Sequence, residues 1–157
     1  MIYAVAIGLL AVGLVAAAWV LRRSISIVTV SGLSMLPTYA AGDRVLVRRA
    51  RIGRLRVGQV VVFEQPDEHG RWAIRPRPAG ARSGWMIKRV AALPGDSWPA
   101  TAWPPRHSSG APGRDRVPAG RLVVTGDNTA VSYDSSTFGY VPADRLLGVV
   151  VRQLDPR

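Results

Sequence analysis

The sequence has no cysteine and only two histidines, His69 and His107, among its 157 residues. The absence of cysteine excludes disulfides, zinc–thiolate sites and cysteine nucleophiles. Both histidines fall in polar stretches, and nothing in the pattern places either of them at the end of a predicted strand. A Ser-His-Asp triad therefore stays open only as an alternative, and we expect neither a metal nor another cofactor.

Lysine is almost absent as well, because twenty arginines accompany a single lysine, Lys88. Arginine stays protonated at any physiological pH, whereas a lysine in an apolar pocket can lose its proton and act as a base. On a strand, Met86, Lys88 and Val90 would share one face and Arg89 would point to the other. Lys88 is therefore a candidate neutral amine base. This segment alone would look the same if a single lysine had remained by chance in an arginine-rich sequence.

Charge is missing from the twenty residues between Ile2 and Leu21. At about 1.5 Å per residue a helix of this length spans roughly 30 Å, the hydrocarbon thickness of a bilayer. A cleaved signal peptide would need basic residues before the run, and a buried core helix would show a polar face. Neither feature is present, and Arg22-Arg23 end the run. We predict an N-terminal transmembrane anchor over residues 1–23.

Acidic residues are few, ten against twenty-one basic residues, and the net charge is +11. Nucleic-acid binding would explain such a balance. The basic residues, however, are scattered from Arg22 to Arg157 with one cluster from Arg44 to Arg56, and no helix-turn-helix pattern accompanies them. Attraction of an anchored chain to anionic lipid headgroups is the more economical explanation, so we expect membrane lipid and no nucleic acid as a partner.

The rest of the chain, residues 24–157, consists of short β-branched runs separated by Gly, Pro and Asp turns. Residues 65–84 and 97–120, which are rich in Pro and Gly, are predicted to be irregular excursions. The pattern predicts a mainly β domain, a barrel or sandwich of short strands. The predicted strands are Ile25–Val30, Arg44–Arg48, Gln59–Glu64, Trp85–Ala92, Arg121–Thr125 and Leu146–Gln153.

Three short sequence boxes lie in this β domain. They are Ser34-Met35-Leu36-Pro37-Thr38, then Lys88-Arg89-Val90-Ala91-Ala92-Leu93-Pro94-Gly95-Asp96, then Gly126-Asp127-Asn128 followed by Ser132, Asp134, Ser135 and Gly139. The boxes resemble S-M-x-P-T, K-R-V-x-x-L-P-G-D and G-D-N-x-x-x-S-x-D-S-R-x-x-G of the type I signal peptidases, in the family's order and behind an apolar run. The resemblance covers about residues 31–148. It implies a small single-anchor serine endopeptidase with a signal-peptidase-like β fold.

The resemblance also implies roles for the residues of the boxes. Ser34 would be the nucleophile and Lys88 the general base of a Ser-Lys dyad. Ser132 would orient the lysine amine through its hydroxyl, and Asp134 would be a buried acid that braces the site. A carboxylate too close to Lys88 would raise its pKa, so we expect other partners to hold Asp134 away from it. The supporting positions in the same boxes are Gly126, Asp127, Asn128, Met35, Pro37 and Arg89.

Two positions depart from the family pattern. Ser136 stands where the family often has an arginine that pairs with the acid, so Asp134 needs another partner, for which Arg145 and Arg89 are the candidates. Gly32 stands two residues before the nucleophile, where some members have a serine that donates to the oxyanion. An oxyanion hole would then depend on backbone N–H groups, including that of Ser34, and on a second donor that the sequence does not identify.

The family implies cleavage of signal peptides or leader segments from exported precursors, after small residues. A dedicated maturation protease for one precursor is an alternative. A self-cleaving repressor-like Ser-Lys protease is another, although that class carries a DNA-binding module and no anchor. An inactive membrane-bound binding module is disfavoured by the intact Ser34 and Lys88.

The orientation in the membrane is a separate question. Arg22-Arg23 favour a cytoplasmic catalytic domain, whereas the family places this domain outside the cytoplasm. We expect the family's orientation, with a single pass through the cell membrane.

Overall fold

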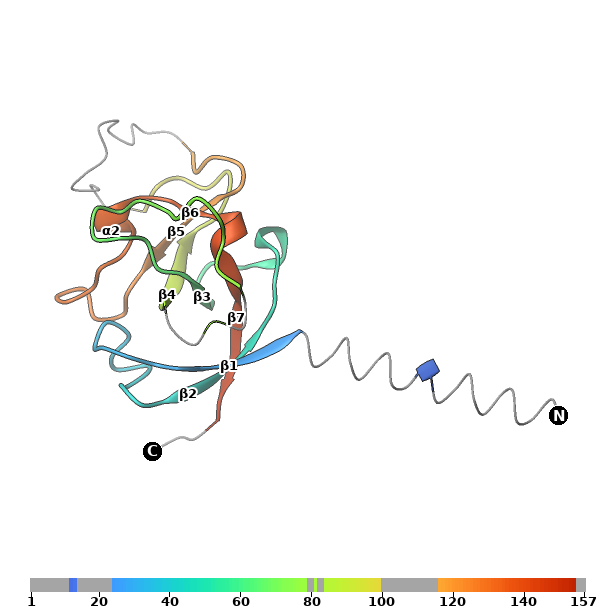
Figure 1. Ribbon diagram of the computed structural model, residues 1–157. Helices are drawn as coiled ribbons and strands as arrows, with labels where there is room; N and C mark the ends of the chain where they lie inside the picture. The colour runs from blue at the N-terminus through green and yellow to red at the C-terminus, as the bar shows by residue number, and fades with distance from the viewer. Residues whose placement is uncertain (1–11, 14–23, 79–80, 82–83, 100–115, 155–157) are drawn as a thin grey trace.

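A computed structural model describes residues 12–13, 24–78, 81, 84–99 and 116–154. They form one curled antiparallel sheet with the strand order β1-β2-β7-β3-β4-β5-β6 (Figure 1). Within these ranges no helix has the length and apolar character that crossing a bilayer requires. The predicted anchor lies almost entirely outside the described residues.

The strands follow the prediction closely. Four of them have the predicted bounds, and two differ by one residue at one end. The strand β6 was not predicted, because it has only two residues and one of them is a proline. The strands are β1 (Ile25–Thr29), β2 (Arg44–Arg48), β3 (Val60–Glu64), β4 (Trp85–Ala92), β5 (Arg121–Thr125), β6 (Val141–Pro142) and β7 (Leu146–Gln153). The short helices are η1 (Ile52–Arg54), α2 (Ser135–Phe138) and η3 (Ala143–Arg145).

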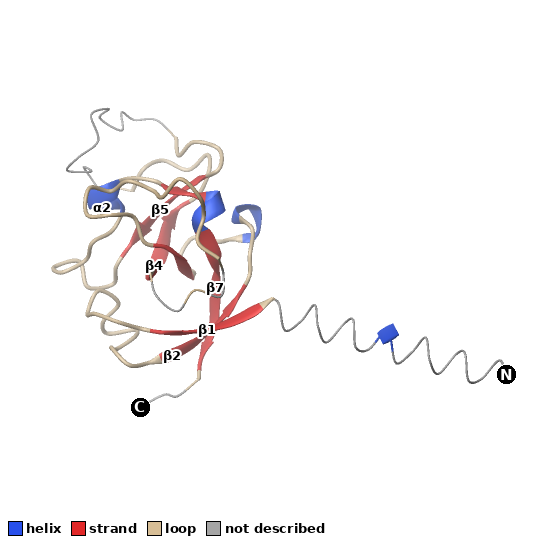
Figure 2. Ribbon diagram, in the orientation of Figure 1, coloured by secondary structure: helices blue, strands red, loops and turns tan. Residues whose placement is uncertain are grey.

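The curl of the sheet depends on β7, which pairs with β3 through its first half and with β2 through its second half. Figure 2 shows β7 extending down to β1 and β2. The register shifts in both pairings, and such bulges increase the local twist of a sheet. Gly148 lies where β7 meets the end of β2, and a Cβ there would come within 2.2 Å of the Arg48 carbonyl oxygen. Only glycine permits this close approach without a backbone shift.

The core is divided between the two faces of β3, all of whose residues are buried. Val60 and Val62 pack with residues of β2 and of the loop that precedes it, whereas Val61 and Phe63 pack with β5 and β7. Burying each such side chain contributes roughly 1.5–3 kcal/mol. Because both of its faces are covered, β3 forms the buried centre of the molecule, next to β4.

The first predicted excursion packs against this core. No strand occurs in its described part, residues 65–78, 81 and 84, but Trp72 lies 6.5 Å from Phe63 and 6.0 Å from Phe138 between ring centroids. This aromatic cluster fixes α2 on the sheet, as Phe138 is the last residue of α2. In the second excursion Ser97 bridges Arg116, and residues 100–115, with His107, lie outside the described ranges.

Candidate active site

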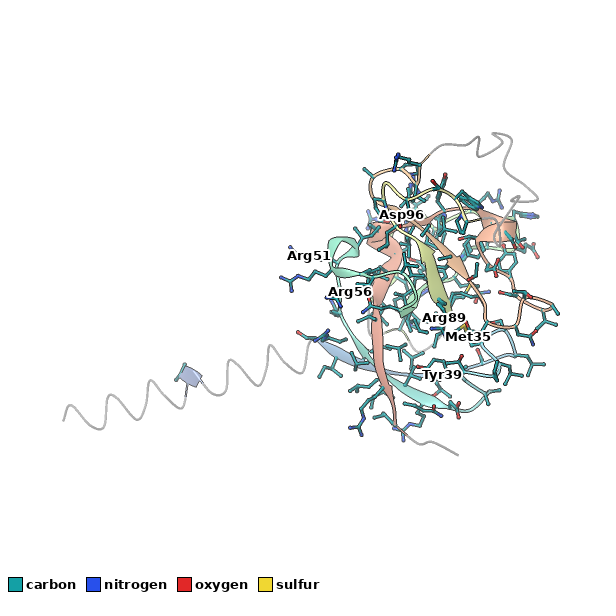
Figure 3. The ribbon with its side chains drawn as sticks, turned by 180° about the vertical axis from the view of Figure 1, so that it is seen from behind. Met35, Tyr39, Arg51, Arg56, Arg89 and Asp96 are labelled. Carbon is teal, nitrogen blue, oxygen red and sulfur yellow. The ribbon has the colours of Figure 1, made fainter. Side chains whose placement is uncertain are left out.

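Ser34 lies in the loop that joins β1 to β2, residues 30–43, hereafter the serine loop, and its neighbour Met35 anchors that loop. Met35 is 1% exposed and packs in the core beside Val45 and Val47. The peptide bond between Leu36 and Pro37 is cis. Figure 3 shows Met35 and Arg89 of β4 in the same region, and Arg89 Nη2 donates to Thr38 Oγ1 at 3.2 Å, so the loop of the first box lies against the strand of the second box.

Lys88 lies in the middle of β4, paired with Val61 of β3, and it is 3% exposed. Its Nζ donates a hydrogen bond of 2.5 Å to Ser34 Oγ. Burial lowers the pKa of the Lys88 amine from its ordinary 10.5 to about 8, although the negative charges of Asp134 and Asp127 act in the opposite direction. Lys88 thus contacts a serine hydroxyl and has a pKa much closer to neutral pH than that of an ordinary lysine.

Arg89, the next residue of β4, points to the other face and ties the three boxes together. Its Nε and Nη2 donate to the two carboxylate oxygens of Asp127 at 2.7 and 2.6 Å, a bidentate pair. Its Nη1 donates to the Gly58 carbonyl at 2.7 Å. The Thr38 hydroxyl donates a hydrogen bond to Asp127 and accepts one from Arg89 Nη2 at 3.2 Å. These hydrogen bonds hold the pKa of the Asp127 carboxyl below its ordinary value.

The turn that contains Asp127 also fixes the backbone of the serine loop. Asn128 N–H donates to the Ser34 carbonyl at 2.9 Å, and its side-chain amide donates to the Leu33 carbonyl at 3.3 Å. A Cβ at Gly126 would lie 2.6 Å from the Ser34 carbonyl oxygen and 2.3 Å from Ser132 Oγ. Gly126 is therefore required for the turn to approach the serine loop this closely.

Asp134 is 4% exposed and accepts four hydrogen bonds. Its Oδ2 accepts from Gly126 N–H at 2.9 Å and from the Ser132 hydroxyl at 2.6 Å. Its Oδ1 accepts from Ser136, both from the backbone N–H at 3.0 Å and from the hydroxyl at 2.8 Å. Asp134 is the N-cap of α2, so one carboxylate begins a helix and supports the turn next to the serine loop.

A cleft of about 230 Å³ opens beside Ser34 and Lys88. The walls come from β1 and the serine loop, from β4, and from the segment before α2. The lining residues include Val28, Leu33, Met86, Ile87, Val131 and Tyr133. This cleft, the serine cleft, mixes these apolar side chains with polar ones from Thr29, Ser31 and Gln65, and both the Ser34 hydroxyl and the Lys88 amine are part of its lining.

The profile of the family "Signal peptidase, peptidase S26" matches residues 1–98 and 100–154, almost the whole chain. This chain belongs to the signal peptidase family. The match includes the three boxes, whose residues the fold brings together around Ser34 and Lys88.

Individual relatives have moderate sequence identity. A signal peptidase I from Leptolyngbya laminosa is 31% identical over 141 residues, which are 78% of this chain and 65% of that protein. A mitochondrial ATP-independent inner membrane protease subunit 1a from Arabidopsis thaliana is 31% identical over 138 residues, 86% of this chain and 73% of that protein. A solved signal peptidase I from Enterococcus faecalis V583 has 17% identity and a TM-score of 0.39, covering 61% of this chain and 96% of that one. The chain spans less than two thirds of the Leptolyngbya protein.

The prediction that Arg145 or Arg89 pairs with Asp134 is wrong. Arg89 pairs with Asp127, and Arg145 pairs with Glu64, its Nη1 lying 3.2 Å from Glu64 Oε2. Ser136, which stands where signal peptidases often have arginine, supplies two neutral donors to Asp134 instead. The expectation that other groups occupy this carboxylate agrees with the geometry. The single proton of the Ser132 hydroxyl is directed to Asp134, so its action on the lysine amine stays a prediction.

The sequence did not predict the four-residue helix α2. A signal for it was present, because Asp134 is a preferred N-cap residue and Gly139, with a φ of 82°, is a preferred helix stop. Among the histidines, the side chain of His69 is 65% exposed and lies 3.6 Å from Glu68, and it does not line the serine cleft. His107 lies outside the described residues.

Proposed function

We propose that this chain is a membrane-anchored serine endopeptidase that cleaves signal peptides or leader segments from exported precursors after small residues. The contact of 2.5 Å between the buried Lys88 Nζ and Ser34 Oγ, both of which line the serine cleft, carries the proposal. Membership of the signal peptidase family supports the substrate class. Residues 1–23 are proposed to be the anchor, and residues 24–157 the catalytic domain.

In the proposed mechanism the neutral amine of Lys88 accepts the proton of the Ser34 hydroxyl as Oγ attacks the scissile carbonyl. The lysine then gives this proton to the leaving amine, and a water activated by the same amine releases the acyl enzyme. Among the described residues no group accepts a hydrogen bond from the Ser34 N–H. This N–H is therefore available to the oxyanion, where a single donor is typically worth about 2.7–4 kcal/mol.

The pH dependence follows from the Lys88 pKa. Because the base must be neutral, kcat/KM should rise with pH through an apparent pKa of about 8 and approach its plateau above it. With an ordinary lysine as the base, this rising limb of the pH profile would lie near the lysine's own pKa, about 10.4. Initial rates on a peptide substrate between pH 6 and 10, with fold checked by circular dichroism at each pH, measure the limb. A flat profile across that range would exclude Lys88 as the titrating base.

The substrate class is tested by incubating the purified full chain with a panel of secretory precursors and sequencing the new N-termini. We expect cleavage of several precursors after small residues, and none by the Ser34→Ala variant. Cleavage of a single precursor would favour the dedicated maturation protease. Cleavage only within the chain itself would favour the repressor-like alternative. No cleavage of any kind would refute the proposal.

The orientation is a separate proposal, with the catalytic domain outside the cell membrane. Protease added to spheroplasts should degrade residues 24–157 without lysis. Full protection before lysis, with degradation after it, would place the domain in the cytoplasm, in agreement with the charge of Arg22-Arg23.

A further inference from the structure

A second hollow is lined largely by arginines, and neither Ser34 nor Lys88 is among its lining residues. No acidic residue occurs between Asp43 and Glu64, whereas six arginines do. Three of them, Arg49, Arg51 and Arg54, line a hollow of about 560 Å³ together with Ala50, Leu146 and Leu147. None of these residues lines the serine cleft. The hollow is thus a cationic site that the proposed peptidase chemistry does not use.

The guanidinium groups of this hollow are available to a ligand. Within the described part of the chain, no carboxylate lies within 4 Å of Arg49, Arg51 or Arg54. A fold that places three unneutralised arginines around one hollow concentrates positive potential there. Guanidinium groups match phosphate oxygens in planar, bidentate geometry, so a phosphate group is the ligand whose chemistry fits.

A neighbouring hollow of about 200 Å³ shares Arg49, Leu146 and Leu147 with the first. It is also lined by Glu64 and Asp144, which would repel an anion. Its buried Arg145, 8% exposed, already pairs with Glu64. The neighbouring hollow thus places two carboxylates beside three arginines, Arg49, Arg77 and Arg145, whereas no carboxylate is among the lining residues of the first hollow.

The position of the arginines relative to the N-terminal run indicates where the phosphate comes from. Arg49 N–H donates to the Ser24 carbonyl at 2.8 Å. Ser24 follows Leu21, the last residue of the uncharged run, by three residues, which reach at most about 10 Å. Figure 1 shows the turn with η1 on the same side of the molecule as the start of β1, and Figure 3 shows Arg51 and Arg56 at that edge. If residues 2–21 cross a bilayer, the arginines lie at the level of its headgroups.

We propose that Arg49, Arg51 and Arg54 bind the phosphate of an anionic phospholipid at the bilayer surface. Such a contact next to the anchor would fix the height and tilt of the β domain over the membrane. The inference rests on the proposed anchor and is independent of the proposed peptidase chemistry, since lipid binding is measured without any substrate.

The test uses the full chain in maltoside micelles, doped with phosphatidylglycerol or phosphatidylcholine, with the retained lipid counted by native mass spectrometry. We expect phosphatidylglycerol to be retained in preference to phosphatidylcholine. The double variant Arg51→Gln/Arg54→Gln should bind phosphatidylglycerol at least about fivefold more weakly. The control Arg75→Gln/Arg121→Gln removes the same charge from exposed residues that do not line the hollow, and should change binding by less than about twofold. Melting temperatures establish that both variants are folded.

Three outcomes would overturn the proposal. Equal losses in the two double variants would mean that net charge alone attracts the lipid. Equal retention of the two lipids would mean that the net negative charge of the headgroup is not recognised. Displacement of phosphatidylglycerol by an equal concentration of inorganic phosphate would mean that the hollow is a site for free phosphate and not for a lipid.

Discussion

Ser34→Ala and Lys88→Ala should each lower kcat/KM for a cleavable precursor by on the order of a thousandfold or more, as removal of a nucleophile or its base does in serine peptidases. The physical reason is that Oγ and Nζ act as a unit across 2.5 Å, so losing either one removes the same step. Hydrolysis of a precursor by each variant, measured at pH 9 where the lysine is mostly neutral, gives the loss.

Two further substitutions of Lys88 separate its chemistry from its packing. Lys88→Arg keeps the charge but cannot accept a proton, so it should be as inactive as Lys88→Ala. Lys88→Met fills a similar volume without charge. At pH values below about 8 the folded and unfolded chains both hold the lysine proton, and the pKa shift from 10.5 to about 8 corresponds to a burial cost of roughly 3 kcal/mol. Lys88→Met should therefore be inactive and yet melt at a higher temperature. Substantial activity of Lys88→Arg would exclude the general-base role.

Asp134→Ala should lower both stability and activity. The substitution removes the acceptor of four hydrogen bonds, including one from the buried Gly126 N–H, and the N-cap of α2. An unsatisfied buried donor costs about 1–3 kcal/mol and a lost N-cap about 0.5–2 kcal/mol. We expect a loss of roughly 3 kcal/mol, measured by urea unfolding, and a melting temperature lower by about 10 °C. An unchanged unfolding free energy would contradict this role.

Asp134→Asn separates the charge of this residue from its shape. The amide keeps one acceptor oxygen for Ser136 or for Gly126 but not for both, so the loss of stability should be smaller than in Asp134→Ala. Because the Asp134 charge raises the Lys88 pKa, its removal should also move the acid limb of kcat/KM to lower pH. A purely structural role would lower the rate and leave the limb in place.

The strands could be predicted from sequence because their information is local. Alternating or continuous β-branched runs ended by Gly, Pro and Asp define β2, β4, β5 and β7 to the residue. The order of the strands, with β7 between β2 and β3, depends on long-range pairing that no local pattern contains. The predicted anchor and residues 100–115 lie outside the described residues, so those predictions stand as they were made.

The members of the candidate site could also be predicted, but only through the three boxes and their resemblance to a family. Spacing alone did not reveal how the members interact. Arg89 was a candidate partner of Asp134, and it instead binds Asp127. On β4 its guanidinium lies on the face opposite Lys88, where Asp127, Thr38 and the Gly58 carbonyl are its partners. Ser136 seemed to leave Asp134 without a partner. The geometry of an N-cap, which appears only when α2 forms, gives Asp134 two donors from that residue.

The hydrogen bond from Asn128 N–H to the Ser34 carbonyl has a consequence for the order of events during synthesis. Ser34 and Lys88 are synthesised before residue 128. The turn that supports the serine loop can form only after residue 128 has left the ribosome. A nascent chain that ends at β4 contains both reacting groups and lacks their support. We expect proteolytic competence to appear only after most of the chain has been synthesised, so that the growing polypeptide is inactive until the turn at Asn128 has formed.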